Sequence, residues 1–154
     1  MAPYSIHYEF VQNFNVPAED AFAWCTDYSE EDMTLMQETD AKRKVHHIAD
    51  DVLILIDTFS NSSGKTVEKQ KLVCLYPKRL SWTSTHLTGP NMHSQFLYEI
   101  TALSERKSQL KFTGLSMDYE IKNEDDAKRL GKQLRQMDSE KWRLLAHEMQ
   151  KELR

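Results

Sequence analysis

The stretch FVQNFNVPAEDAFAWCTD, residues 10–27, decides the fold of this chain. Apolar residues alternate with polar ones from Tyr4 and keep the same parity up to Val16, which is typical of a strand with one buried face. Pro17 stops that strand and suits the first turn of a helix, where no backbone N–H is needed. Two acidic residues follow in that turn, at the positive end of the helix dipole. The stretch therefore predicts a strand followed at once by a short helix.

A second short helix is expected directly after the first. Ser29 followed by Asp32 has the pattern of a helix N-cap, and the apolar residues behind it would form one helical face. Beyond that point, alternating segments separated by short turns predict an antiparallel sheet. These segments are residues 43–49, 51–59, 66–76, 79–87, 93–103 and 108–121.

The period changes to that of a helix after Asn123, which is a suitable N-cap. The apolar positions that follow fall mostly three or four apart: Ala127, Leu130, Leu134, Met137, Trp142, Leu145, Met149 and Leu153. We expect Trp142 on the buried side of this helix. A helix of roughly 30 residues reaches about 45 Å, close to the roughly 40 Å diameter of a globule of this length. The sequence leaves open whether the helix continues through Gly131.

A curved antiparallel sheet has a concave face that another element must cover. The C-terminal helix is the only predicted element long enough to do so. Because a straight helix cannot touch a strongly bent sheet everywhere, we expect a space between them. The sequence thus predicts one α+β domain over residues 1–154, with seven antiparallel strands around the helix and the two short helices closing one end.

Two segments resemble a known superfamily. VPAEDAFAWCTD, residues 16–27, is similar to the common opening of START-like, or SRPBCC, domains, and LYPKRLSWTST, residues 75–85, is similar to a strand opening in the middle of such chains. The order of elements is similar over nearly the whole chain. This resemblance implies the helix-grip fold, which Bet v 1-like proteins, polyketide cyclases and lipid-transfer domains share. The superfamily has no common catalytic set, so the resemblance assigns no residue a role.

Composition narrows the classes of protein. The net charge is −4 with both signs mixed along the chain, which argues against a nucleic-acid-binding face. The longest apolar run, Val52–Ile56, is far below the roughly 18 residues of a membrane span. No basic region with an apolar core opens the chain, so we expect no signal peptide and a cytoplasmic location. Cys25 and Cys74 have no metal-ligand spacing and are expected to be buried thiols.

Candidate site residues are those whose parity or helical phase points them into the expected space. The ligand-binding residues predicted in this way are Trp82, His86, Phe96, Tyr98, Tyr119, Leu134 and Met137. We expect a mainly apolar wall with a few polar tips, supplied by the tyrosines and the histidine. Lys69 and Lys71 share one strand face, and an inward-pointing charge there would hint at function.

His86 and His93 flank the turn between two strands and could reach one ligand group. The alternative is that both are exposed at a hairpin end. No third ligand matches their register, so no metal site and no cofactor is predicted.

The sequence favours binding of a small apolar or amphipathic ligand, such as a lipid, isoprenoid or polyketide-like ring, between the sheet and the C-terminal helix. One alternative is a cyclase, dehydratase or hydrolase with His86, Tyr98 or Tyr119 as acid or base. The other is a protein-interaction domain like the co-chaperone relatives of the fold. The oligomeric state stays open.

Overall fold

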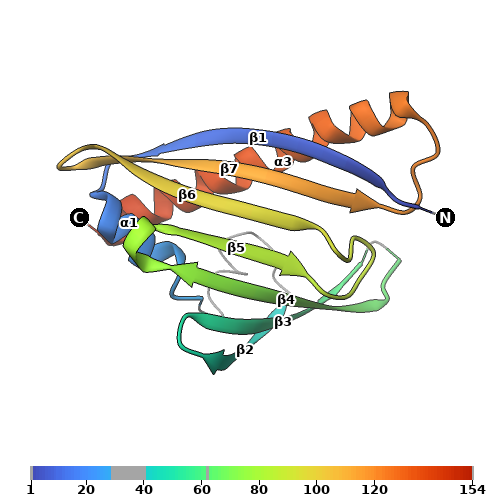
Figure 1. The fold of residues 1–154 in the computed structure, drawn as a ribbon, viewed down its shortest axis with the longest axis horizontal. Coiled ribbons are helices and arrows are strands. Elements are labelled where there is room, and N and C mark those ends of the chain that lie inside the picture. The colour runs from blue at the N-terminus through green and yellow to red at the C-terminus, as the bar shows by residue number, and fades with distance from the viewer. Residues whose placement is uncertain (1, 29–40, 62, 154) are drawn as a thin grey trace.

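One antiparallel sheet dominates the computed structural model, which describes residues 2–28, 41–61 and 63–153. Its seven strands lie in the order β1-β7-β6-β5-β4-β3-β2, so the first strand pairs with the last (Figure 1). The strands are β1 (Tyr4–Phe14), β2 (Lys42–Ala49), β3 (Val52–Ser60), β4 (Thr66–Tyr76), β5 (Ser81–His86), β6 (Gln95–Ser104) and β7 (Lys107–Asp118). All neighbours along the chain after β1 are joined as hairpins, as the short turns predict.

Three helical segments accompany the sheet in the described residues: α1 (Ala18–Cys25), the 3-10 turn η1 (Pro77–Arg79) and α3 (Glu124–Glu152). Asn123 caps α3, because its side-chain oxygen accepts a hydrogen bond of 2.9 Å from the N–H of Asp126. The helix runs unbroken through Gly131, where a Cβ would lie only 3.2 Å from Cγ2 of Ile6. The second short helix expected after α1 falls within residues 29–40, outside the described residues.

The helix α3 follows one face of the sheet along β1, β7 and β6 (Figure 1). Near its C-terminal end, Leu145, Ala146 and Met149 are buried, and Ala146 and Met149 pack into a core that also contains Phe14 and α1. Earlier on the helix, Met137 is 53% exposed. Apolar side chains therefore pack between sheet and helix near α1, and the gap is more open farther along α3. These observations confirm the predicted helix-grip arrangement of a seven-stranded antiparallel sheet and a long C-terminal helix.

Trp142 is only half-buried, although the periodicity predicted it on the buried side of α3. Its ring packs at a tilt against Phe14, with ring centroids 6.5 Å apart, and against Tyr98, with centroids 5.8 Å apart. Phe14 belongs to the core, whereas Tyr98 borders an internal cavity. Trp142 thus marks the boundary between the packed and the open part of the gap.

The burial pattern of α3 generates a stability prediction. Met149→Ala should lower the free energy of unfolding by about 2–5 kcal/mol, because it removes a fully buried side chain and leaves a void. Leu144→Ala is the matched control, since Leu144 is 39% exposed, and should cost about 0.5 kcal/mol or less. Denaturant titration followed by tryptophan fluorescence measures both variants. Equal losses would contradict the observed phase of the helix.

Candidate functional site

An internal cavity of about 310 Å³ lies between the inner face of the sheet and α3. We call this space the chamber. Residues from β1, β2, β3, β4, β5, β6, β7 and α3 line it. A side pocket of about 120 Å³ adjoins it towards α1 and reaches Trp24 and Cys25. The residues that line both spaces are Arg43, Lys71, Ser84, Tyr98, Trp142 and Leu145.

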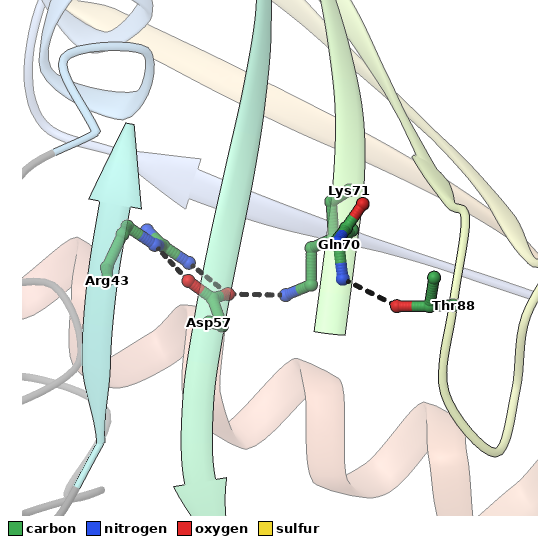
Figure 2. A network of polar contacts seen from close by, with 5 residues as sticks. All are labelled: Arg43, Asp57, Gln70, Lys71 and Thr88. Atoms are coloured by element: carbon green, nitrogen blue, oxygen red, sulfur yellow. Dashed lines mark hydrogen bonds and ion pairs between the residues drawn. The ribbon is translucent and has the colours of Figure 1, made fainter. Parts of the chain in front are cut away.

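A buried ion network crosses three neighbouring strands on the chamber wall (Figure 2). Asp57 of β3 is 1% exposed and accepts hydrogen bonds of 2.7 and 2.9 Å from Nε and Nη2 of Arg43 on β2. Its second oxygen also lies 3.0 Å from Nζ of Lys71 on β4. Burial alone would raise the pKa of Asp57, but the Arg43 hydrogen bond and the charges of Lys71 and Arg43 outweigh it and hold the pKa low. Asp57 therefore stays ionised.

A hydrogen bond ties the strand of Lys71 to the loop over the chamber. The backbone N–H of Gln70 donates to Oγ1 of Thr88 at 3.0 Å (Figure 2). The same loop, residues 87–94 between β5 and β6, packs Gly89 over the stem of Lys69, since a Cβ at Gly89 would lie 3.1 Å from Cγ of that lysine. Gly89 also has φ +99°, which favours glycine. The loop is thus fixed beside the chamber and carries Asn91 into its wall.

Charged side chains are the main departure from the predicted apolar wall. Four cations line the chamber: Arg43, Lys69, Lys71 and Lys141. Among the described lining residues, only Asp57 and Asp138 are carboxylates. Cationic side chains therefore outnumber carboxylates among the described residues of the lining. Lys69 and Lys71 are the pair that the sequence singled out as possible inward charges, and both reach the chamber.

A second polar contact joins the first strand to α3. The hydroxyl of Tyr8 donates to Oδ2 of Asp138 at 2.5 Å, and the two residues are 130 positions apart in the chain. Burial raises the pKa of Asp138, and the Tyr8 hydrogen bond and nearby lysines only partly offset this effect. Burial and the neighbouring Asp138 raise the pKa of Tyr8, so the phenol keeps its proton. Asp138 is therefore a carboxyl group suited to exchanging a proton inside the chamber.

His86 of β5 lies inside the chamber wall and is 7% exposed, not at an exposed hairpin end. Burial and the charges of Lys71 and Lys69 lower its pKa to about 3, so the ring is neutral near pH 7. Its Nδ1 is buried without a hydrogen-bond partner, as is Oδ1 of Asn91. Asn91 lies close enough to favour the protonated ring slightly, but no well-aligned hydrogen bond joins the two.

Aromatic rings form the other part of the wall. Trp82 stacks on Tyr98 with centroids 4.7 Å apart and planes at 3°. Tyr98 meets the edge of Phe112 at 5.2 Å, and Phe96 tilts against His86 at 5.0 Å. Burial raises the pKa of Tyr98, so its hydroxyl is a donor near neutral pH. One wall can therefore stack against a flat apolar body, and the other can meet polar groups.

The structure brings most of the predicted site residues together. The residues from that set that line the chamber are His86, Phe96, Tyr98, Leu134 and Met137. Trp82 lines the side pocket and not the chamber itself. Tyr119 lines neither space: its hydroxyl donates to the carbonyl of Met92 at 3.2 Å and lies 3.3 Å from Nδ1 of His93. His93 is exposed beside it, so His86 and His93 do not meet in one site.

Sequence reasoning missed Arg43, Asp57 and Asp138. The sequence could have predicted the two carboxylates, because each occupies a position that the strand or helix periodicity assigns to the interior. Asp57 continues the inward parity of Leu53 and Leu55, and all three are buried. Asp138 lies one helical turn from both Leu134 and Trp142. A charge at such a position indicates a polar interior site.

The described residues contain no group of three or more His, Cys, Asp or Glu side chains that could hold a metal ion. Within the same part of the chain, no helix is both long and apolar enough to cross a membrane.

Solved structures share this fold at low sequence identity. No model of a known protein family matches the chain, and no curated protein matches it. The Zhui aromatase/cyclase from Streptomyces sp. R1128 is 16% identical with a TM-score of 0.72, and the match covers 98% of this chain and 97% of that one. The di-domain aromatase/cyclase StfQ of the steffimycin biosynthetic pathway is 11% identical with a TM-score of 0.75. That match covers 96% of this chain but 51% of StfQ, so this chain spans about half of its length.

The Bet v 1-type allergen Ara h 8.0201 is 11% identical with a TM-score of 0.68, and the match covers 95% of this chain and 98% of the allergen. At these identities the likeness shows the fold alone. It confirms the architecture that the resemblance to START-like domains implied.

The neutral state of His86 generates a prediction on pH dependence. The unfolded chain protonates His86 near pH 6.5, whereas the folded protein does so only near pH 3. Between these values unfolding takes up a proton, so the free energy of unfolding falls as the pH is lowered, by up to about 1.4 kcal/mol per unit from this residue. His86→Phe removes that proton and should flatten the curve between pH 6 and 4. Denaturant titrations across this range measure it, and identical slopes in both proteins would contradict a neutral buried His86.

Proposed function

We propose that the protein binds a small amphipathic molecule in the chamber between the sheet and α3. The observation that carries this proposal is a cavity of about 310 Å³ with aromatic rings on one part of its wall and charged groups on another. Ligand cavities typically have volumes of about 300–1,000 Å³ and combine apolar walls with a few polar groups. The fold shared with aromatase/cyclases and with Ara h 8.0201 supports a site between sheet and helix.

The charges support a functional rather than a structural role for the cavity. Replacing a buried ion pair by well-packed apolar residues is often neutral or stabilising. A chain under demand for stability alone has no need to place Asp57 between two cations, nor Asp138 on the apolar stripe of α3. Groups of this kind remain favourable where they keep contact with water or with a polar ligand.

The same charges narrow the ligand classes. A plain hydrocarbon chain would displace water from the charged wall without replacing its hydrogen bonds, which is unfavourable. A ring compound with several oxygen atoms can stack on Tyr98 and still satisfy the polar groups. Among the lipid, isoprenoid and polyketide-like classes, the chamber therefore favours an oxygen-bearing ring compound.

A variant that fills the chamber tests the proposal. Ser84 is buried on β5 and lines both the chamber and the side pocket, so the added ring of Ser84→Phe should enter empty space. The neutral fluorophore phenylnaphthylamine should bind the natural protein with a dissociation constant of about a micromolar, and Ser84→Phe should bind it at least about tenfold more weakly. Thr83→Phe, on the opposite face of the same strand, is the matched control and should bind it as before.

Fluorescence titration gives the affinities, and thermal unfolding shows whether each variant is folded. A folded Ser84→Phe that binds the fluorophore as tightly as the natural protein would place the fluorophore on the outer surface. That result would favour the protein-interaction alternative over a chamber ligand.

A second candidate function is acid–base catalysis on the bound molecule, and the contact between Tyr8 and Asp138 is the observation that favours it. Asp138 has a raised pKa and faces the chamber, which are the properties of a general acid or base. His86 is a poor base here, because its pKa is lowered to about 3. Tyr98 can act only as a donor near neutral pH. Asp138 thus replaces the acids and bases that the sequence suggested.

Dehydration of a β-hydroxy ketone tests this candidate. A base removes the proton next to the carbonyl, and the hydroxyl leaves as water once an acid protonates it. The aldol adduct of acetone and benzaldehyde loses water to give benzylideneacetone, whose absorbance reports the rate. Asp138→Asn should slow any protein-dependent rate by about a hundredfold or more, whereas Glu140→Gln, an exposed neighbour on α3, should not. Equal rates for the natural protein and Asp138→Asn would exclude Asp138 as the proton-transfer group.

A further inference from the structure

We propose that the free edge of β1 binds an extended peptide segment that carries acidic side chains at every second position, beside the first half of α3. The inference is independent of a ligand in the chamber, because the backbone groups and cations that would hold the segment do not line the chamber. Three observations carry it: an open strand edge, a groove along that edge, and a row of positive charge on the helix wall of the groove.

The first observation is the direction of the backbone groups of β1, which is an edge strand of the sheet. Nε of Arg135 donates to the carbonyl of Glu9 at 3.0 Å, and a glutamine oxygen of α3 accepts a 2.9 Å hydrogen bond from the N–H of Asn15. These groups therefore point away from β7. Successive residues of an antiparallel strand turn their backbone groups to opposite sides, and β1 pairs with β7 without a register shift. The N–H and C=O groups of Ser5 and His7 thus point to the same free edge.

This edge has no neighbouring strand in the described part of the chain. Among the described residues, no backbone group pairs with Ser5 or His7 from the side away from β7. Exposed edges of this kind are templates for a further strand, and most proteins cover or interrupt them. The helix α3 passes behind β1, and its first half extends beyond the free edge (Figure 1). A strand added to β1 would therefore continue the sheet over the helix, which is the geometry of β-strand addition.

The second observation is a groove of about 670 Å³ along this edge. One wall is β1 from Ser5 to Glu9, and the other is the first half of α3. Two of the lining residues on the helix, Ala127 and Gly131, are small, and a Cβ at Gly131 would lie 3.2 Å from Cγ2 of Ile6. Helix and strand are thus in contact there, and an extended segment can approach the edge without displacing a large apolar side chain.

The third observation is the charge of the helix wall. Lys128, Lys132 and Arg135 line the groove, are exposed, and lie four and three residues apart, so they share one face of α3. Neither lysine forms an ion pair with another described residue. The groove also contains Glu9 and Glu124, but Glu9 has the strand parity of the outer face of the sheet and Glu124 is the first residue of α3. The middle of the helix wall is therefore positive, and acidic side chains complement it.

The pairing geometry narrows the partner further. Side chains of a strand alternate between its two faces, so every second side chain of an added strand would face α3. Acidic groups at those positions would meet the three cations of the helix wall, while main-chain hydrogen bonds to the edge supply affinity. A second copy of this chain fits less well, because pairing β1 with β1 would bring the same positive rows together.

Two peptides of equal length test the charge pattern. In one, valine and glutamate alternate; in the other, glutamine replaces glutamate, and both carry fluorescein. Fluorescence polarisation at low salt should show that the whole protein binds the glutamate peptide at least about fivefold more tightly. In Lys128→Gln/Lys132→Gln this preference should fall to about twofold or less, because most of the positive row is gone. Arg143→Gln/Lys151→Gln removes two exposed charges from the other half of α3 and should keep the preference.

Hydrogen exchange tests the mode of docking. With the glutamate peptide bound, the amides of Ser5, His7 and Glu9 should exchange about tenfold or more slowly, because they then donate to the added strand. The amides of Ile6 and Tyr8 are the internal control, since they point to β7 and should change little.

Other outcomes overturn the inference. Equal affinity for both peptides, or a preference that persists in the lysine double variant, would remove the helix wall as the binding surface. Binding without slower exchange at Ser5, His7 and Glu9 would show attraction by charge without strand addition. Slow exchange of these amides that increases with protein concentration in the absence of peptide would identify a second copy as the occupant. Binding of neither peptide would also overturn the inference, and the exchange measurement on the natural protein stands even if a variant does not fold.

Discussion

Asp57 holds Arg43 and Lys71 together on the inner face of the sheet, and the open part of the molecule depends on this contact. Each of the three residues comes from a different strand, so the network also fixes the side chains of β2, β3 and β4 relative to one another (Figure 2). Losing one member of a buried ionic network typically costs about 3–5 kcal/mol, because the remaining charge is left without a partner. Charged groups are favourable in contact with water or a polar ligand, and the cavity between the sheet and α3 lies at this network. At the α1 end, Phe14 and Met149 belong to an apolar core in which the same two elements pack together.

The network also sets the electrostatics of the chamber. Burial keeps His86 neutral, and the charges of Lys71 and Lys69 act in the same direction. The pKa of Asp138 shifts in the opposite direction from that of Asp57. Burial raises it, and the hydrogen bond from Tyr8 and the nearby lysines do not fully offset this effect. One cavity thus contains a carboxylate fixed in its charged form and a carboxyl group that can exchange a proton. Binding and proton transfer are both chemically accessible to such a wall.

The sequence predicted the fold well and the site only in part, for physical reasons. Strand and helix periods are local properties, so the alternation around Tyr4 and the spacing after Asn123 are sufficient for the elements and their buried faces. A site depends on which side chains converge across strands, and Tyr8 and Asp138 meet over 130 positions. Trp82 and Tyr119 were predicted to line the chamber, but neither does. The side chain of Trp82 points inwards, as its strand parity predicts, but it lines the side pocket near α1. The hydroxyl of Tyr119 instead donates to the carbonyl of Met92 in the β5–β6 loop.

The central claim is that the chamber between the sheet and α3 is a binding site that its buried charges hold open. A crystal structure of the protein with phenylnaphthylamine bound tests it most directly, because it locates the molecule and its orientation together. The account predicts the molecule inside the chamber, with its rings beside Tyr98. A molecule bound on the outer face of the sheet, or α3 packed onto a closed sheet with no room for it, would contradict the account.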